Sequence, residues 1–266
     1  MKKLIALDID GTLLNSNHQI SRKTKDTLSK AMEKGHKVVL VSGRAPVGVF
    51  HLAEELNFEK FGGLISGNNG ATIINYRNRE LVSDHTLDLD LVKNIFDVTK
   101  DLDASILLYR GSDLISSKDN KAFRANLEAQ PLNPIIIENI RDTIDYSPNK
   151  IIFVEEADPI DDLITIVDNN FKDMVEYIKS LPFLFEIMPK GLSKGKSLLE
   201  IAELYGIDQK DIIAFGDEMN DVTMLEVAGI AVAMGNAVSP IKEIADYVTL
   251  SNDEDGIADY LEKFVL

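Results

Sequence analysis

Short apolar runs alternate with amphipathic stretches over the first 70 residues of the chain. The runs at 4–7, 38–41 and 64–66 are apolar on both faces, as in strands buried within a sheet. The stretches between them, 21–34 and 47–56, have the pattern of helices. Strands that alternate with helices in this way predict a parallel sheet with right-handed crossovers.

The pattern changes after about Val82. A predicted helix at 89–100 precedes a hairpin with strands at 105–109 and 114–117. The remaining elements predicted in this stretch are strands at 150–154, 174–179 and 183–188 and a helix at 159–169. Hairpins mixed with helices indicate an α+β unit rather than more βαβ repeats.

From Ser193 onward the first pattern returns. The predicted elements are a helix at 193–205, a strand at 211–215, a short helix ending at 228, a strand at 230–233, a helix capped by Ser239, a strand at 247–250 and a C-terminal helix. The fold class is therefore α/β, with a Rossmann-like parallel-sheet core. We expect this core to comprise residues 1–82 and 189–266, split by an inserted α+β cap domain at 83–188.

Composition narrows the functional classes. The formal net charge of −16 argues against general nucleic-acid binding, because such binding needs a basic surface. The same negative charge would repel a phosphorylated substrate, so the site of such a substrate would need a local cation. The 266 residues include no cysteine, which excludes disulfides and thiolate chemistry. No apolar run approaches ~18 residues, and the run after Lys2-Lys3 is too short for a signal peptide. We therefore expect a cytoplasmic protein that does not bind membranes.

The first strand ends in two carboxylates, Asp8 and Asp10, followed by Gly11 and Thr12. Ligands of open α/β sheets bind outside the carboxyl ends of the strands, so these acids are a candidate catalytic pair. We expect the turn to bring both carboxylates to one centre, one as nucleophile and metal ligand and the other as proton carrier. An ordinary acidic turn is the alternative. A calcium-binding EF-hand is excluded, because the chain lacks the Gly and Glu that this loop needs at its sixth and twelfth positions.

Ser42-Gly43-Arg44 follows the second strand. A hydroxyl and free backbone N–H groups at such a strand end can bind an anion. A serine that caps the following helix is the alternative.

Residues 190–197 resemble a phosphate-binding Walker A loop, but Lys190 stands where that pattern requires glycine. We therefore do not expect nucleotide binding by this loop. Lys194 and Lys196 lie in the first turn of a predicted helix, where the helix dipole disfavours cations. This placement favours a lysine that pairs with phosphate, although two solvated lysines remain the alternative.

Residues 216–221 place three acids and an amide directly after another apolar strand. Oxygen ligands of this kind suit Mg²⁺, and an acidic helix cap is the alternative. The four histidines, at 18, 36, 51 and 85, have no ligand spacing. Residues 253–255 are expected to be a solvated acidic helix start.

These four motifs, in this order and with a large insertion before the third, resemble the haloacid dehalogenase superfamily. Within it they are most similar to the Cof-like phosphatases, which carry a large α+β cap. The motifs at 8–14 and 216–221 are the most specific, and Asn69-Gly70-Ala71 looks like the turn before the cap in that subgroup. The resemblance covers essentially the whole chain. It implies a cap that excludes bulk water from the site and selects the leaving group.

The resemblance also implies a catalytic pair and a Mg²⁺ site. Asp8 would be the nucleophile and, through its carboxylate, a metal ligand. Asp10 would be the general acid/base and would offer its backbone carbonyl to the metal. Asp217 would be a further ligand, with Glu218 and Asp221 acting directly or through water.

The phosphate-binding groups follow from the same resemblance. They would be the Ile9 and Gly43 amides, the Ser42 hydroxyl, Lys194 and Asn220. Lys194 rather than Lys196 matches the lysine of the third motif. Ser42 departs from the more usual threonine but keeps the hydroxyl.

The resulting prediction is a Mg²⁺-dependent phosphatase that hydrolyses small phosphorylated metabolites, such as sugar phosphates, through an aspartyl-phosphate. A phosphotransferase or phosphomutase on the same core, and a non-catalytic metabolite-binding regulator, remain alternatives. The sequence leaves the oligomeric state and the exact substrate open.

Overall fold

The computed structural model describes residues 2–154 and 160–266. Its chain forms two compact units, one comprising Met1–Ser83 and Ser193–Leu266 and the other Asp84–Leu192. Residues 189–192 group with the second unit. No helix in the two described ranges is long and apolar enough to cross a membrane.

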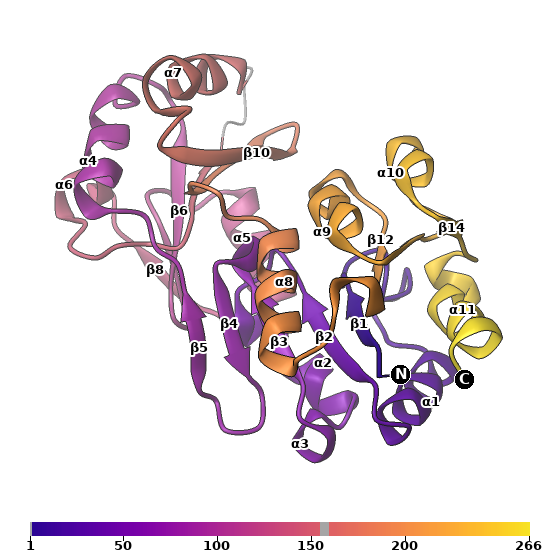
Figure 1. Cartoon of the computed structure of the whole chain (residues 1–266). Helices are drawn as coiled ribbons and strands as arrows, with labels where there is room; N and C mark the ends of the chain where they lie inside the picture. The colour runs from indigo at the N-terminus through magenta and orange to yellow at the C-terminus, as the bar shows by residue number, and fades with distance from the viewer. Residues whose placement is uncertain (1, 155–159) are drawn as a thin grey trace. The chain divides into compact units, whose positions relative to one another are not determined.

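An eight-stranded sheet forms the centre of the first unit (Figure 1). Its strands are β1 (Leu4–Leu7), β2 (Lys37–Val41), β3 (Leu64–Gly67), β4 (Thr72–Asn75), β5 (Leu81–Asp84), β12 (Ile212–Gly216), β13 (Ile230–Ala233) and β14 (Tyr247–Val248). Their order is β14-β13-β12-β1-β2-β3-β4-β5. From β14 to β3 every pair is parallel, which confirms the predicted parallel core, and β4 then returns antiparallel to β3.

Helices cover both faces of this sheet. They are α1 (Arg22–Glu33), α2 (Phe50–Glu55), α3 (Phe58–Phe61), α8 (Lys194–Tyr205), α9 (Val222–Val227), α10 (Ser239–Ile244) and α11 (Gly256–Phe264). Successive side chains of β1 point to opposite faces. Ile5 and Leu7 pack in one core with side chains from α1, α2 and α11, whereas Leu4 and Ala6 pack in another with side chains from α8, α9 and α10. The unit is therefore a three-layered α/β/α fold, which explains why β1 is apolar on both faces.

Three predicted elements of this unit differ from the structure. The strand predicted at 247–250 covers only Tyr247–Val248. The helix predicted at 47–56 is divided into a 3₁₀ turn at Pro46–Gly48 and the helix α2. The division falls at Gly48, because glycine is a weak helix former. The prediction of Ser239 as an N-cap is wrong. Val238 holds the extended cap conformation, because its N–H donates to the Asp217 carbonyl at 3.0 Å, and Ser239 is the first helical residue.

The second unit is built on a mixed six-stranded sheet of order β10-β11-β9-β6-β7-β8. Its strands are β6 (Ser105–Arg110), β7 (Asp113–Ser116), β8 (Asn133–Ile136), β9 (Ile151–Val154), β10 (Val175–Leu181) and β11 (Leu184–Pro189). Its helices are α4 (Leu89–Val98), α5 (Lys121–Ala129), α6 (Ile140–Thr143) and α7 (Asp161–Phe171). The hairpin of β6 and β7 is confirmed, with Tyr109 opposite Leu114. Residue 159, where α7 was expected to begin, lies outside the described residues.

Three elements of this unit lack a clear sequence signal. β8 contains Pro134 and lies at the sheet edge beside β7, where a missing N–H is tolerated. α5 has nine residues and α6 only four, and neither helix was predicted. The α+β character predicted for the insertion is confirmed.

Strand order determines where the motifs meet. The chain runs from β1 through β2 to β3 on one side of β1 and returns at β12 on the other. Leu7 is in register with Leu40 of β2 and Phe215 of β12, so the residues after all three strands emerge at the same edge. This edge, at the switch point beside β1, is where open α/β sheets bind ligands.

Candidate active site

Three buried carboxylates gather beyond the ends of β1 and β12. Asp8 is 6%, Asp217 7% and Asp221 0% exposed, and one oxygen from each lies within 4.8 Å of the others. Asp8 is placed by its own backbone, whose N–H donates to the Phe215 carbonyl at 3.1 Å. We call these three residues and Lys194 the acid cluster.

Lys194 joins the cluster from the first turn of α8. Its Nζ donates to Oδ1 of Asp8 at 2.6 Å and to Oδ1 of Asp221 at 2.7 Å, and its side chain is 1% exposed. Ser193 caps the helix by accepting the Lys196 N–H at 3.1 Å, and Lys196 itself is exposed. The structure therefore brings Lys194, and not Lys196, to the acids.

Close packing fixes the helix that carries this lysine. The Gly195 N–H donates to the Thr223 hydroxyl at 3.2 Å, and a Cβ on Gly195 would lie 2.1 Å from the Thr223 carbonyl oxygen. Only glycine allows α8 to approach the start of α9 so closely. The Ser197 hydroxyl adds a buried contact with Ser66 of β3 at 2.8 Å.

Asp221 holds the loop after β12 together. Its Oδ2 accepts the N–H groups of Asp217 at 3.0 Å and of Glu218 at 3.2 Å, while its Oδ1 accepts from Lys194. Glu218 is exposed, and its carboxylate accepts the Met219 N–H. Glu218 and Asp221 also form a capping box, in which the side chain of each accepts the backbone N–H of the other. Asn220 lies half-buried in the same turn.

Gly11 and Thr12 shape the surroundings of Asp217. Gly11 has a φ of +78°, and a Cβ there would lie 2.1 Å from Oδ2 of Asp217. The buried Thr12 hydroxyl donates to Oδ1 of Asp217 at 2.7 Å. The glycine and threonine of the first motif thus position a carboxylate of the fourth motif.

The charges of the acid cluster do not balance. Burial, and after it the charge of Asp221, raises the pKa of Asp8 well above its ordinary value, against the opposing effect of Lys194. Burial likewise raises the pKa of Asp217 to about 6, against the hydrogen bond from Thr12. Burial alone would lower the pKa of Lys194, but the carboxylates of Asp221 and Asp8 outweigh it and raise that pKa. With one lysine among three buried carboxylates, the acid cluster lacks positive charge, which a bound cation could supply.

The donor set fits a small divalent cation. All three acids offer hard carboxylate oxygens, the ligands that Mg²⁺ takes, and their repulsion in a buried site is what a cation would relieve. Asp8 and Asp217 are the better placed, because both oxygens of Asp221 already accept hydrogen bonds. The site therefore suits Mg²⁺ in chemistry and in charge.

Asp10 lies in different surroundings from Asp8. Its side chain is 54% exposed, and the guanidinium of Arg44 contacts both of its oxygens, Nε to Oδ2 at 2.9 Å and Nη2 to Oδ1 at 2.6 Å. Asp10 is thus not one of the three acids whose oxygens gather beyond the ends of β1 and β12. Arg44 belongs to the second motif, but nothing in the sequence marks its pairing with Asp10.

The remaining predicted phosphate-binding groups lie after β1 and β2. Ile9 is fully buried and Ser42 is 2% exposed, with its Oγ accepting the Arg44 N–H at 3.1 Å. Gly43 is in tight contact with Asn69, whose Oδ1 would lie 2.8 Å from a Cβ on this glycine. The Asn69 N–H donates to the Ser42 carbonyl at 2.9 Å, so the turn after β3 supports the loop after β2.

Two asparagines support the first motif without a sequence signal of their own. The Asn236 amide donates to the Gly11 carbonyl at 2.8 Å, and the Asn252 amide donates to the Leu14 carbonyl at 2.8 Å. The Asn252 N–H also donates to Oδ1 of Asn236 at 3.0 Å. Both follow strands of the core sheet, and searching every strand end for polar residues could have found them.

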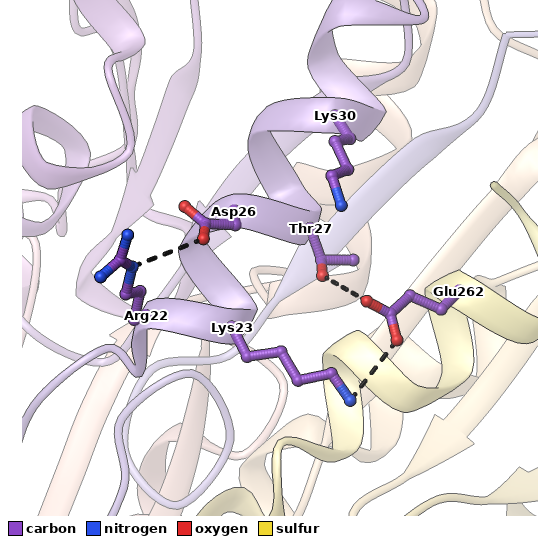
Figure 2. Close-up of a pocket in the computed structure, with 6 residues that line it drawn as sticks. All are labelled: Arg22, Lys23, Asp26, Thr27, Lys30 and Glu262. Carbon is purple, nitrogen blue, oxygen red and sulfur yellow. Dashed lines mark hydrogen bonds and ion pairs between the residues drawn. The ribbon is translucent and has the colours of Figure 1, made fainter.

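A second group of charges surrounds a groove between α1 and α11 (Figure 2). We call it the α1–α11 groove. It is lined by Arg22, Lys23, Asp26, Thr27, Lys30 and Glu262. Figure 2 shows Lys23 and the Thr27 hydroxyl both directed at Glu262, with contacts of 3.4 and 3.2 Å. None of the predicted site residues lines this groove.

The family model of haloacid dehalogenase-like hydrolases matches residues 5–261. The chain belongs to this family. The recognition of the haloacid dehalogenase (HAD) superfamily from four motifs is thereby confirmed.

Relatives of this HAD hydrolase include named phosphatases. YcsE of Bacillus subtilis, a 5-amino-6-(5-phospho-D-ribitylamino)uracil phosphatase, is 33% identical over 99% of this chain and 96% of its own. A solved HAD-like hydrolase from Bacteroides thetaiotaomicron is also 33% identical, with a TM-score of 0.88 over 99% of both chains. A solved HAD subclass IIB sugar phosphatase is 25% identical, with a TM-score of 0.83 over 99% of both chains.

Proposed function

We propose that this HAD phosphatase is Mg²⁺-dependent and hydrolyses small phosphorylated metabolites through a phosphate ester of Asp8. The observation that carries the proposal is the buried contact of 2.6 Å between Asp8 and Lys194. It holds one oxygen of Asp8 in place and leaves Oδ2 to attack phosphorus. Splitting hydrolysis into two displacements is ordinary covalent catalysis.

Electrostatics favours a phosphate beside Asp8. Lys194 stays protonated because two carboxylates surround it, so its charge is shared between the nucleophile and an incoming phosphoryl group. The Ser42 hydroxyl, the Ile9 and Gly43 amides and Asn220 are the other proposed contacts of the phosphoryl oxygens. These groups offset the repulsion between an anionic nucleophile and an anionic ester.

The acid cluster is the proposed metal site. Asp8 and Asp217 would hold Mg²⁺ through carboxylate oxygens and Asp10 through its backbone carbonyl, with Glu218 and Asp221 acting directly or through water. When bound, Mg²⁺ neutralises charge on the phosphoryl oxygens. Thr12 and Gly11 set the position of Asp217, so they determine the geometry of this site without contacting substrate.

Asp10 is the proposed proton carrier. As the phosphorus–oxygen bond of the ester breaks, Asp10 gives its proton to the departing oxygen. The carboxylate then takes a proton from the water that attacks the aspartyl-phosphate, which releases phosphate and restores both acids. Its 54% exposure suits this role, because a proton carrier must reach the leaving group and water.

Residues 83–188 are proposed to select the substrate, while residues 1–82 and 189–266 perform the chemistry. Two relatives act on phosphate esters of small polyhydroxylated molecules, one a sugar phosphatase and one a ribitylaminouracil phosphatase by name. We therefore propose sugar phosphates and similar metabolites as the substrate class.

The test is a panel of phosphorylated metabolites assayed for phosphate release by the wild type and by Asp8→Asn. We expect turnover that Mg²⁺ supports and chelation stops reversibly, and a loss of ~10⁴-fold or more in the variant. The Asp8→Asn fold should be retained, because the change removes a buried charge and Lys194 keeps its contact with Asp221. Full activity of a folded Asp8→Asn variant would refute the covalent mechanism.

A further inference from the structure

The structure places an arginine against the proposed proton carrier. From this geometry we propose that Arg44 is a positioning residue for Asp10, holding its carboxylate where it can serve the leaving group and the attacking water. The inference rests on the proposed function of Asp10. It adds a residue that the four motifs did not mark for chemistry.

Asp10 needs such a partner. Its side chain is 54% exposed, and a carboxylate in solvent samples several rotamers that are not productive. Its neighbours in the motif, Asp8 and Thr12, are held by buried hydrogen bonds to other residues, whereas Arg44 contacts both Asp10 oxygens. A guanidinium that binds a carboxylate through two nitrogens fixes its plane as well as its position.

Arg44 is itself well anchored. Its side chain is 14% exposed, so this is not a fully solvated ion pair. Its N–H donates to the Ser42 hydroxyl at 3.1 Å, and its carbonyl accepts the Asn68 N–H at 2.8 Å. The guanidinium is therefore attached to a backbone that is held by its own loop and by the turn after β3.

Backbone conformation in that turn supports the same interpretation. Asn68 and Asn69 both have positive φ values, of 52° and 57°, which cost energy for residues other than glycine. A Cβ on the preceding Gly67 would lie 3.0 Å from the Arg44 carbonyl oxygen. This strained turn thus directs an N–H at Arg44, and Arg44 in turn orients Asp10. The two Asp10 oxygens offer about four lone-pair sites and the guanidinium uses two of them, so a lone pair remains that can carry the proton.

The test compares two phosphate esters in single-turnover and steady-state assays. p-Nitrophenyl phosphate has a good leaving group that needs no proton, whereas an alkyl phosphate needs one. We expect Arg44→Gln to slow alkyl ester cleavage by ~10²-fold, the lower end of what general acid catalysis contributes, with little change in KM. p-Nitrophenol release should instead show a rapid burst followed by slow turnover, because only the second step then needs Asp10.

Three controls isolate the positioning role. Arg44→Lys should recover part of the alkyl ester rate through a single contact, and Arg22→Gln, which removes an exposed arginine that faces Asp26 at 3.8 Å, should change neither rate. In an Asp10→Asn background, Arg44→Gln should have no further effect on the ratio of the two rates. Thermal unfolding of each variant reports loss of fold separately.

The outcomes separate the proposals. A rise in KM with kcat unchanged would show that Arg44 binds substrate directly, and equal losses for both esters that follow thermal stability would show a structural role. Additive effects of Arg44→Gln and Asp10→Asn would also overturn the inference. If the wild type cleaves neither ester nor any metabolite, the proposed function fails and this inference with it. Wild-type turnover with an unchanged ratio in Arg44→Gln overturns the inference alone.

Discussion

The acid cluster and the α1–α11 groove contain similar numbers of charges but differ in their access to water. In the cluster, Lys194 is 1% and Asp221 0% exposed, whereas in the groove the side chains of Arg22 and Lys23 are 94% and 50% exposed. Water screens the groove, so its ion pairs are weak, and each charge there can be lost at little cost. The buried charges depend on one another. Burial, not the number of charges, therefore distinguishes the acid cluster from the α1–α11 groove.

The largest expected effect is that of removing the buried lysine. Lys194→Met leaves Asp8 and Asp221 without a cation, and we expect it to destabilise the metal-free protein by roughly 3–5 kcal/mol at pH 7. Urea unfolding with a chelator measures this loss. The matched control is Lys196→Met, two residues further along the same helix and exposed.

Lys196→Met should change stability by less than about 0.5 kcal/mol and leave phosphatase activity intact. Equal losses in the two lysine variants would contradict the contrast between buried and exposed charge. Lowering the pH should restore part of the stability of Lys194→Met, because the pKa of Asp8 is raised and protonation removes the unpaired charge.

A smaller effect is expected from a methyl group on Gly11. Its φ of +78° alone costs about 1–2 kcal/mol for alanine, and the new Cβ would also displace the Asp217 carboxylate, from which it would lie 2.1 Å away. We expect Gly11→Ala to lose Mg²⁺ affinity and activity in addition to stability. Calorimetric titration with Mg²⁺ measures the affinity.

Gly206→Ala is the control for backbone strain. Gly206 has a φ of +63° after α8, and a Cβ there would meet no atom within 4 Å. The two variants should lose similar backbone stability, but only Gly11→Ala should lose Mg²⁺ binding. Intact Mg²⁺ affinity in Gly11→Ala would show that the carboxylate of Asp217 is not held by this contact.

The pH dependence of Mg²⁺ binding should be more modest. The metal needs ionised carboxylates, and the pKa of Asp217 is raised by burial to about 6. Below pH 6 a proton competes, so the apparent Kd for Mg²⁺ should rise ~10-fold per pH unit. Without metal, pH affects the stability of the fold through Asp217 in the opposite direction. Because the pKa of Asp217 is higher in the folded than in the unfolded protein, this residue stabilises the fold most at low pH, and the stabilisation falls as the pH rises from 4 to 6.

Thr12→Val tests the hydrogen bond that opposes this rise in the pKa of Asp217. The Thr12 hydroxyl lowers the pKa of Asp217 through a hydrogen bond of 2.7 Å, and valine has nearly the same shape without the donor. The loss of Mg²⁺ affinity should therefore begin at a higher pH in the variant. An unchanged profile would mean that another group governs the competition with protons.

The smallest effects should come from the groove. Lys23→Met breaks an exposed ion pair with Glu262 of 3.4 Å and should cost less than ~1 kcal/mol, decreasing further at high salt. Phosphatase activity should not change. A loss of stability as large as that of Lys194→Met would contradict the difference between buried and exposed charges.

Much of the core was predictable because its signals are local. Three of the motifs follow short apolar strands of the core sheet, and parallel strands end at one edge, so the meeting of Asp8 and Asp217 follows from strand order. Lys194 instead reaches them from the first turn of α8. The pairing of Asp10 with Arg44 could not be predicted, because it depends on two loop conformations that have no periodicity. The expectation that Asp8 and Asp10 share one centre therefore did not anticipate the exposed position of Asp10.

Predictions were weaker where tertiary context outweighs local preference. Ser239 looks like an N-cap, but a hydrogen bond from Val238 to the Asp217 carbonyl moves the cap by one residue. β8 was not predicted, and it accommodates Pro134 because it lies at the sheet edge. Asn236 and Asn252 act through contacts with backbone carbonyls of the first motif, and no spacing in the sequence marks such contacts.

The order of the strands also has a consequence for synthesis on the ribosome. β1 lies between β2 and β12, so the first strand to emerge must wait for residues 212–216 before both of its edges are paired. At typical elongation rates this delay is on the order of tens of seconds. Residues 84–192 emerge during the delay and form a unit with its own core, so they can fold while β1 waits. Asp8 consequently receives its buried partner Lys194 only after most of the chain has been made.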